Sequence, residues 1–212
     1  MGVFFGVRQP LSSFVAVDNF SEGIGNWTAD PSDADATMDW YENDSLRISI
    51  NTGSSAESDR LSAFWNNGLV GNFDIEVEYK RLTTSGSGSR VYGFYVSPSP
   101  GDFDNHIFVV QPDDSPTMRC RYRLSGSTQE QIDNSIKPDP TLSNLRLRIV
   151  KVGSLFTTYH DNGDGIWNEV GQLDAPPFES TTMIPALYTS RFGATALSVR
   201  YDNFKVVTGT LS

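Results

Sequence analysis

Residues 145–173 constrain the fold of this chain more than any other stretch. In LRLRIVKVGSLFTTYHDNGDGIWNEVGQL, leucine and isoleucine first alternate with arginine, which is typical of a strand with one buried face. Glycine-containing turns follow at residues 152–154 and 161–165, and the segments beside them are β-branched and aromatic. We therefore predict an antiparallel meander of three strands, whose apolar face must pack on a second sheet.

The rest of the chain divides into short segments of the same kind, and no helical periodicity persists over ten residues. Further strands are predicted at residues 14–20, 36–41, 45–50, 60–65, 73–82, 90–96, 106–111, 117–124, 183–190 and 195–207. Residues 125–142 are polar and contain proline, so we expect a long surface connection there. The sequence thus predicts an all-β fold, with an N-terminal arm over residues 1–13 and a single β-sandwich domain over residues 14–212.

The composition excludes several classes of protein. The formal net charge of −10 argues against broad binding to a nucleic-acid backbone. Cys120 is the only cysteine, so an intrachain disulfide is excluded, and two histidines leave little material for a zinc site. The first ten residues lack the pattern of a signal peptide, and no stretch reaches transmembrane length.

Four segments together resemble a known superfamily. They are VAVDNFSEGIGNWT near the start, LRLRIVKVG and LFTTYHDNGDGIWNEVG in the meander, and ALSVRYDNFKV near the end. This pattern is similar to the concanavalin A-like lectin/glucanase superfamily, and within it to laminin-G-like and carbohydrate-binding jelly rolls. The resemblance implies a two-sheet antiparallel jelly-roll sandwich. Because that sandwich carries lectins, glycosidases and interaction modules, it leaves the function to be argued from the site.

Three carboxylates are the candidate catalytic residues. Asp74, Glu76 and Glu78 alternate with apolar residues, so a regular strand places all three on one face. This resembles the Glu-x-Asp-x-Glu strand of the lichenase and laminarinase glycosidases, which supplies the nucleophile and the acid/base. Retaining glycosidases need these carboxyl groups about 5–5.5 Å apart. Here the order is Asp-x-Glu-x-Glu, and a solvated polar face is the competing interpretation. We therefore expect that the chain is not an enzyme, with a glycoside hydrolase as the alternative.

Arginines form two stripes on predicted strands. Arg119, Arg121 and Arg123 alternate with apolar residues, and Arg146 and Arg148 do so in the meander. One interpretation is a site for phosphate or a sulfated glycan. The favoured interpretation is cross-strand pairing with acidic stripes such as residues 74–78.

Two patterns bear on calcium, which binds through oxygen ligands. Residues 160–165 resemble part of a calcium loop, but His160 would stand at the first ligand position, so a hairpin turn without metal is favoured. Many relatives in the superfamily hold a structural calcium ion near their termini. By motif, that resemblance implies that Asp202 is the better candidate for a calcium ligand and Asp18 the weaker one. The alternative role of both aspartates is to cap turns. One structural Ca²⁺ is therefore the predicted cofactor.

Exposed aromatic rings are the usual platforms for sugars, although tryptophan and tyrosine are often partly buried. The predicted carbohydrate-binding residues are Trp40, Tyr41, Trp65, Tyr92 and Tyr95. Trp167 and Tyr188 are further candidates, and Trp167 is expected in the core because it follows a turn and alternates with Ile166.

The N-terminal arm carries Phe4, Phe5, Val7 and Leu11 without strand alternation. Burying such side chains contributes about 1.5–3 kcal/mol each, so we expect the arm to dock on another protein subunit. We predict a non-catalytic, lectin-like module that binds carbohydrate or another surface, or that builds a larger assembly. The predicted setting is a phage virion or an extracellular surface assembly. We expect the chain to be oligomeric or part of a multi-protein complex, and to bind no nucleic acid.

Overall fold

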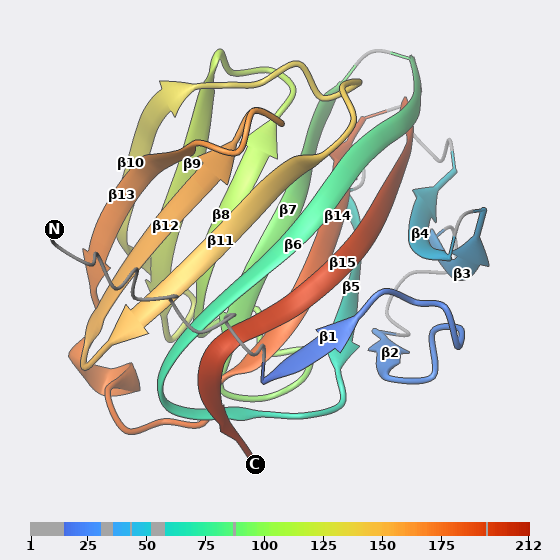
Figure 1. The fold of residues 1–212 in the computed structure, drawn as a ribbon. Helices are drawn as coiled ribbons and strands as arrows, with labels where there is room; N and C mark the ends of the chain where they lie inside the picture. Colours follow the sequence, from blue (N-terminus) through green and yellow to red (C-terminus); the bar gives the residue numbers. More distant parts are fainter. Residues whose placement is uncertain (1–14, 31–35, 43, 52–57, 87, 194) are drawn as a thin grey trace, which may run out of the picture.

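The computed structural model describes residues 15–30, 36–42, 44–51, 58–86, 88–193 and 195–212. These residues form two antiparallel sheets that pack face to face, as predicted for a jelly-roll sandwich (Figure 1). The arm predicted at residues 1–13, with its four apolar side chains, lies outside the described residues. No helix in the described ranges is long and apolar enough to cross a membrane.

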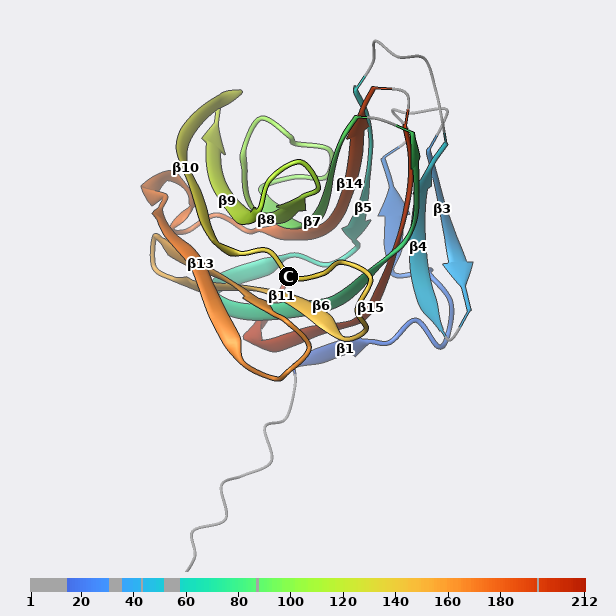
Figure 2. The ribbon, with the colours of Figure 1, turned by 90° about the horizontal axis from the view of Figure 1, so that it is seen from above.

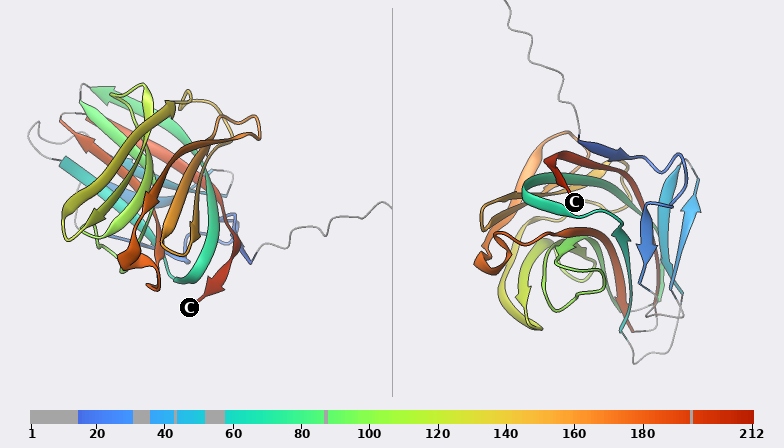
Figure 3. Two further views of the ribbon diagram at one scale, coloured as in Figure 1. Left: turned by 90° about the vertical axis from the view of Figure 1, so that its left-hand side faces the viewer. Right: turned by 90° about the horizontal axis from the view of Figure 1, so that it is seen from below.

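Sheet A has the strand order β13–β12–β11–β6–β15–β4–β3, and β1 also pairs with β15. Its strands are β1 (Ala16–Asp18), β3 (Ala36–Tyr41), β4 (Ser45–Ile50), β6 (Leu69–Gly86), β11 (Leu145–Val152), β12 (Leu155–Asp161), β13 (Trp167–Asp174) and β15 (Thr195–Leu211). The first and last described strands are thus hydrogen-bonded neighbours, which Figure 3 shows from below.

Sheet B has the strand order β10–β9–β8–β7–β14–β5–β2. Its strands are β2 (Trp27–Ala29), β5 (Ser58–Trp65), β7 (Ser89–Ser97), β8 (His106–Pro112), β9 (Thr117–Leu124), β10 (Ser127–Ile136) and β14 (Ile184–Phe192). A short 3₁₀ helix, η1 (Pro176–Phe178), lies between β13 and β14 and returns the chain from sheet A to sheet B.

The predicted meander is present as β11, β12 and β13 at one side of sheet A. Leu147 and Ile149 are buried, whereas Arg148 between them is only half-buried, in agreement with the alternation in the sequence. Gly153 has a φ of +60° in the turn between β11 and β12, a conformation that glycine adopts without strain. The arginines of β11 therefore lie on the outer face of sheet A.

The long connection predicted at residues 125–142 is wrong for most of its length, because residues 127–136 form β10. β10 pairs with β9 through a tight turn, in which Ser125 and Gly126 both have positive φ. It is an edge strand with mostly exposed side chains, and Ile132 is the residue that packs on the core. An edge strand of this kind lacks the apolar alternation on which the prediction relied.

The main core fills the space between the sheets. Phe204 of β15 lies at its centre, with ring centroids 5.0–6.1 Å from those of Trp27, Trp65 and Phe94. These contacts join the long strand β15 of sheet A to three strands of sheet B, so the apolar faces of both sheets are buried together.

Sheet B is strongly curved, and its concave side faces away from sheet A (Figure 2). The connection between β7 and β8, residues 98–105, folds over this concave side. Sheet A lies along the convex side of sheet B. The two outer faces of the sandwich therefore differ, and we call them the concave face of sheet B and the outer face of sheet A.

Candidate functional site

The concave face of sheet B carries a second apolar cluster, which is separate from the core between the sheets. Alternate residues of neighbouring strands point to this side, because successive side chains of a strand point to opposite faces. The buried members of the cluster are Phe64 of β5, Tyr95 of β7, Phe108 and Val110 of β8, and Ala186 and Tyr188 of β14. A sheet face turned only to water would carry polar side chains here, so another layer must cover this one.

Part of that layer is Phe103, from the connection between β7 and β8. Its ring stacks on Tyr188 with centroids 5.1 Å apart and lies 4.6 Å from the ring of His106. The edge of Tyr95 also contacts it, at a centroid distance of 5.8 Å. Phe103 itself is half-buried, so its ring is the outermost aromatic surface of the cluster.

Asp102 fixes the connection that presents Phe103. Its Oδ1 accepts hydrogen bonds from the backbone nitrogens of Asp104 and Asn105, at 3.1 and 3.0 Å, and Asn105 Nδ2 also donates to it. Aspartate favours such turns because its side chain binds backbone N–H groups a few residues ahead. The Phe103 ring is therefore held over the sheet by local hydrogen bonds as well as by stacking.

Arginines form the rest of the covering layer. The guanidinium carbon of Arg121 lies 4.3 Å from the ring centroid of Phe108, and that of Arg60 lies 4.3 Å from the ring centroid of Phe103. Arg123, two residues beyond Arg121 on β9, donates to backbone carbonyl oxygens. The concave face thus combines aromatic rings with guanidinium groups, in a chain whose net charge is −10.

His106 lies beneath these arginines and is fully buried. Its Nδ1 lies 3.0 Å from the carbonyl oxygen of Phe103 and so carries the proton, because a carbonyl oxygen only accepts. Burial lowers the pKa of His106 to about 3, with a further lowering by Arg121, Arg123 and Arg60. The imidazole is therefore neutral at pH 7, and its Nε2 is an acceptor that lies 3.4 Å from Nη2 of Arg121.

The candidate catalytic carboxylates lie on the other side of the molecule. Asp74, Glu76 and Glu78 alternate on β6 with residues of the main core, so they point to the outer face of sheet A. Nε and Nη2 of Arg148 donate to the two oxygens of Asp74 at 2.7 and 2.5 Å, and Lys205 Nζ donates to Glu76 at 3.1 Å. Asp74 and Glu76 are thus joined in cross-strand ion pairs, whereas Glu78 accepts a hydrogen bond from Asn203 Nδ2 at 3.1 Å. None of the three carboxylates belongs to the aromatic cluster of sheet B.

The two arginine stripes have different surroundings. Arg146 and Arg148 on β11 pair with acidic residues of the same sheet, as the favoured interpretation of the sequence required. On β9 only Arg119 is paired in this way, with Asp133 of β10 at 2.5 Å. Arg121 and Arg123 form no ion pair with a carboxylate in the described part of the chain.

The aromatic residues predicted for carbohydrate lie in three different environments. Trp65 and Tyr92 are buried in the main core, and Tyr95 is buried beneath Phe103 on the concave face. Trp40, on the edge strand β3, is 56% exposed, and the neighbouring Tyr41 is half-buried. The carbohydrate role of these residues stays a prediction, and the structure does not bring them together.

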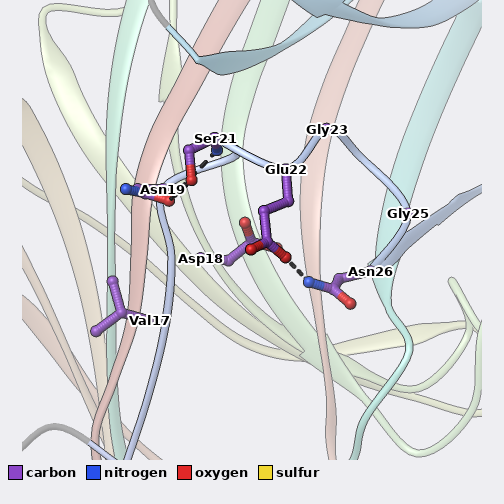
Figure 4. A pocket seen from close by; sticks show the side chains of 8 residues that line it. All are labelled: Val17, Asp18, Asn19, Ser21, Glu22, Gly23, Gly25 and Asn26. Atoms are coloured by element: carbon purple, nitrogen blue, oxygen red, sulfur yellow. Dashed lines mark hydrogen bonds between the residues drawn. The ribbon is translucent and has the colours of Figure 1, made fainter.

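Asp18, a predicted calcium ligand, borders an open pocket of about 310 Å³. Its Oδ1 accepts from the backbone nitrogen of Phe20 at 2.9 Å. Its Oδ2 accepts from Asn26 Nδ2 and Trp27 Nε1 at 3.2 and 3.0 Å, and Figure 4 shows the bond from Asn26. Both oxygens therefore act as acceptors within the protein, which is the turn-capping role.

Asp202, the other predicted ligand, caps Asn203 by accepting from its backbone nitrogen at 2.7 Å. Burial raises the pKa of Asp202, and the negative charges of Glu78 and Asp44 raise it further. Within the described ranges, no three His, Cys, Asp or Glu side chains form a group that could hold a metal ion. Asp18 and Asp202 thus belong to no such group in the described ranges, and one structural Ca²⁺ stays a prediction.

Sequence reasoning missed Phe103, Phe108, Arg60 and His106. One signal was available, because β7 and β8 are apolar at consecutive positions and not at alternate ones. Such runs indicate strands buried on both faces, which implies a cover on the concave side. The identity of that cover depends on the connection between β7 and β8, and its path is not visible in the periodicity.

Comparisons with known proteins bear on the fold. No family model matches the chain, and no curated protein matches its sequence. A β-glucanase of Bacillus licheniformis has a TM-score of 0.63 at 15% identity, over 94% of this chain and 100% of that chain. The potassium-bound carbohydrate recognition domain of Emp46p has a TM-score of 0.61 at 12% identity, over 89% and 94%. The fold is of the concanavalin A-like type. The exoplasmic/lumenal domain of VIP36, bound to Ca²⁺ and Man₃GlcNAc, has a TM-score of 0.52 at 11% identity, over 87% and 86%.

These comparisons confirm the resemblance to the concanavalin A-like superfamily, since both lectins and glucanases share the fold. They contradict the prediction that the chain is not an enzyme, because several endo-glucanases are among the matched structures. That prediction rested on the residue order of one motif, at residues 74–78. A concanavalin A-like sandwich carries both kinds of protein, so one strand on the outer face of sheet A does not decide between them.

Proposed function

We propose that this concanavalin A-like sandwich binds carbohydrate on the concave face of sheet B. The single observation that carries the proposal is the covering layer of that face, where the Phe103 ring and the guanidinium groups of Arg60 and Arg121 lie together. Aromatic rings offer apolar contact to the faces of sugars, and guanidinium groups offer several N–H donors to their oxygens. The carbohydrate ligands of solved neighbours support this class of ligand.

Rigidity is a second support for this face. A binding site loses less free energy when its side chains are held in place before the ligand arrives. Phe103 is stacked on Tyr188, and its connection is tied down by Asp102. Trp40, in contrast, is exposed on an edge strand, and its Nε1 donates to the carbonyl oxygen of Phe20. The concave face is thus better prepared for a ligand than the surface around Trp40.

The experiment is a screen of the full chain against neutral and acidic oligosaccharides, followed by calorimetry on those that bind. Phe103→Ala removes the outermost ring and should weaken binding about twofold to tenfold, because the ring contact contributes roughly 0.5–1.5 kcal/mol. Trp40→Ala is the matched control, because it removes an exposed ring from the edge of sheet A. It should leave the affinity unchanged, and thermal melting checks that both variants fold.

Two results would contradict the proposal. If no oligosaccharide binds at concentrations where the chain stays folded, carbohydrate binding is wrong. If Trp40→Ala weakens binding while Phe103→Ala does not, the site lies at β3 and the assignment to the concave face is wrong.

We also propose that the chain is a module of a larger assembly, either a phage virion or an extracellular surface assembly. The support is the sequence of the arm at residues 1–13, whose apolar side chains would be an exposed tail on an acidic protein. In this arrangement the arm docks on another subunit and the sandwich presents its concave face outward.

Deleting residues 2–12 tests this role. The truncated chain should keep the melting temperature and glycan affinity of the full chain, but it should no longer co-sediment with partner subunits in the native assembly. Normal incorporation of the truncated chain into the assembly would remove the anchoring role and leave a free-standing binding domain.

A further inference from the structure

Arg121 and Arg123 are the cationic groups of the concave face whose charges are not matched within the described residues. Arg119, on the same face of β9, forms an ion pair with Asp133. Nη2 of Arg121 lies 3.4 Å from His106 Nε2, its guanidinium stacks on Phe108, and its Nε is buried with no hydrogen-bond partner. A buried donor without a partner is unfavourable, and the natural partner of a guanidinium group is an anion.

The two side chains belong to one site. Residues 121 and 123 lie two positions apart on β9 and point to the same side of the sheet. Arg123 reaches the carbonyl oxygen of Phe103 at 3.4 Å, and Arg121 contacts His106. Burial raises the pKa of Tyr188, whose ring stacks on that of Phe103, and the positive charges of Arg121 and Arg123 both act to lower it. The two guanidinium groups therefore converge on the aromatic surface of the proposed carbohydrate site.

The surroundings of Arg121 are those of a cation without a counterion. Burial lowers its pKa to about 10, and the positive charges of Arg123 and Arg119 lower it further. Repulsion between like charges is unfavourable in the free protein, and a bound anion would relieve it. In a chain of net charge −10, such a site is a local concentration of positive charge, which attracts an anionic group.

We propose that Arg121 and Arg123 bind the carboxylate or sulfate group of an acidic glycan while the sugar ring lies against Phe103. This inference rests on the proposed function, and it names the class of glycan. Carboxylate and sulfate groups both present paired oxygens to the fork of a guanidinium group, and this geometry distinguishes arginine from lysine. A neutral sugar leaves the charge of both arginines unmatched and binds more weakly.

The experiment compares matched oligosaccharides by calorimetry on the full chain. The carboxylate arm uses tetragalacturonate and its methyl ester, and the sulfate arm uses a chondroitin sulfate hexasaccharide and its desulfated form. At least one acidic member should bind about ten times more tightly than its neutral or desulfated partner, the effect of one charge-assisted hydrogen bond. The arm that shows this ratio identifies the anionic group.

Variants locate the effect. Arg121→Gln and Arg123→Gln should each reduce that affinity ratio toward one. Arg119→Gln is the matched control, because Arg119 lies on the same strand and face but is already paired with Asp133, and it should keep the ratio. Inorganic sulfate provides a measurement that needs no variant, since millimolar sulfate should displace the acidic glycan from the natural chain.

The outcomes separate this inference from the proposed function. Equal affinity of the two members within both matched pairs, or a ratio that Arg119→Gln reduces as much as Arg121→Gln does, overturns the role of the two arginines and leaves carbohydrate binding intact. Binding of none of these glycans, nor of any in the wider screen, overturns both.

Discussion

At the scale of single residues, His106 links the concave face to the pH dependence of stability. Its pKa is about 3 in the folded protein, against about 6.5 for an unperturbed histidine. The unfolded chain therefore binds a proton below pH 6.5 that the folded chain does not, so acid favours unfolding. The contribution of His106 is fully present above pH 6.5 and is lost as the pH falls from 6.5 toward 3.

We predict that the free energy of unfolding falls by about 2 kcal/mol between pH 8 and pH 5 on account of His106. Urea unfolding followed by tryptophan fluorescence measures this slope. His106→Gln should flatten it. His160→Gln is the control, since burial also lowers the pKa of His160, which lies on β12 of sheet A. This variant should remove only the contribution of His160 to the slope and leave that of His106. The same slope in the natural chain and in His106→Gln would contradict the buried, neutral imidazole.

Asp18 leads to a second prediction at this scale. Asp18→Ala removes the acceptor for Phe20, Asn26 and Trp27, and it leaves the indole N–H of buried Trp27 without its partner. We expect a loss of about 1–3 kcal/mol in the free energy of unfolding. Because the loss comes from hydrogen bonds and not from a metal, it should be equal with calcium and with a chelator. If the chelator lowers the melting temperature of the natural chain but not that of Asp18→Ala, then Asp18 is a calcium ligand after all.

At the scale of elements, the pairing of β6 with β11 is reinforced by the ion pair between Asp74 and Arg148. Their side chains are 12% and 26% exposed, so each charge is largely shielded from water. We predict a coupling of about 1–3 kcal/mol in a double-mutant cycle of Asp74→Asn and Arg148→Met, measured by urea unfolding.

The matched control is the pair of Asp39 and Arg47 between β3 and β4. Its side chains are 41% and 31% exposed, so its coupling should stay below about 1 kcal/mol. Equal coupling for the two pairs would mean that burial on the outer face of sheet A does not strengthen its ion pairs.

The same scale shows what the sequence can predict. The meander β11–β13 followed from alternation, because an apolar face against a polar one is a local property of a strand. β10 was missed because an edge strand needs few apolar residues, and its pairing is set by the turn at Ser125 and Gly126. The strand positions of Asp74 and Arg121 were also correct. The sequence did not assign them to one side of the sandwich, since this depends on which sheet each strand joins.

At the scale of the whole molecule, the proposed function depends on the difference between the two outer faces. On the outer face of sheet A, acidic and basic side chains form cross-strand ion pairs: Arg148 pairs with Asp74, and Lys205 and Arg146 pair with Glu76. The concave face of sheet B joins aromatic rings to Arg121 and Arg123. Sequence periodicity predicts two faces for each strand, but only the curvature of the sheets decides which face can enclose a ligand (Figure 2).

NMR tests the proposed binding of carbohydrate to the concave face of sheet B most directly. The isotope-labelled chain is titrated with the tightest-binding oligosaccharide of the screen, and the backbone amide signals are followed by NMR. We predict that the shifted amides lie in β8, β9, β14 and residues 98–105, and that β3, β6 and β11 are unaffected. Shifts concentrated in β3 and β4, or on the outer face of sheet A around β6 and β11, would contradict the account.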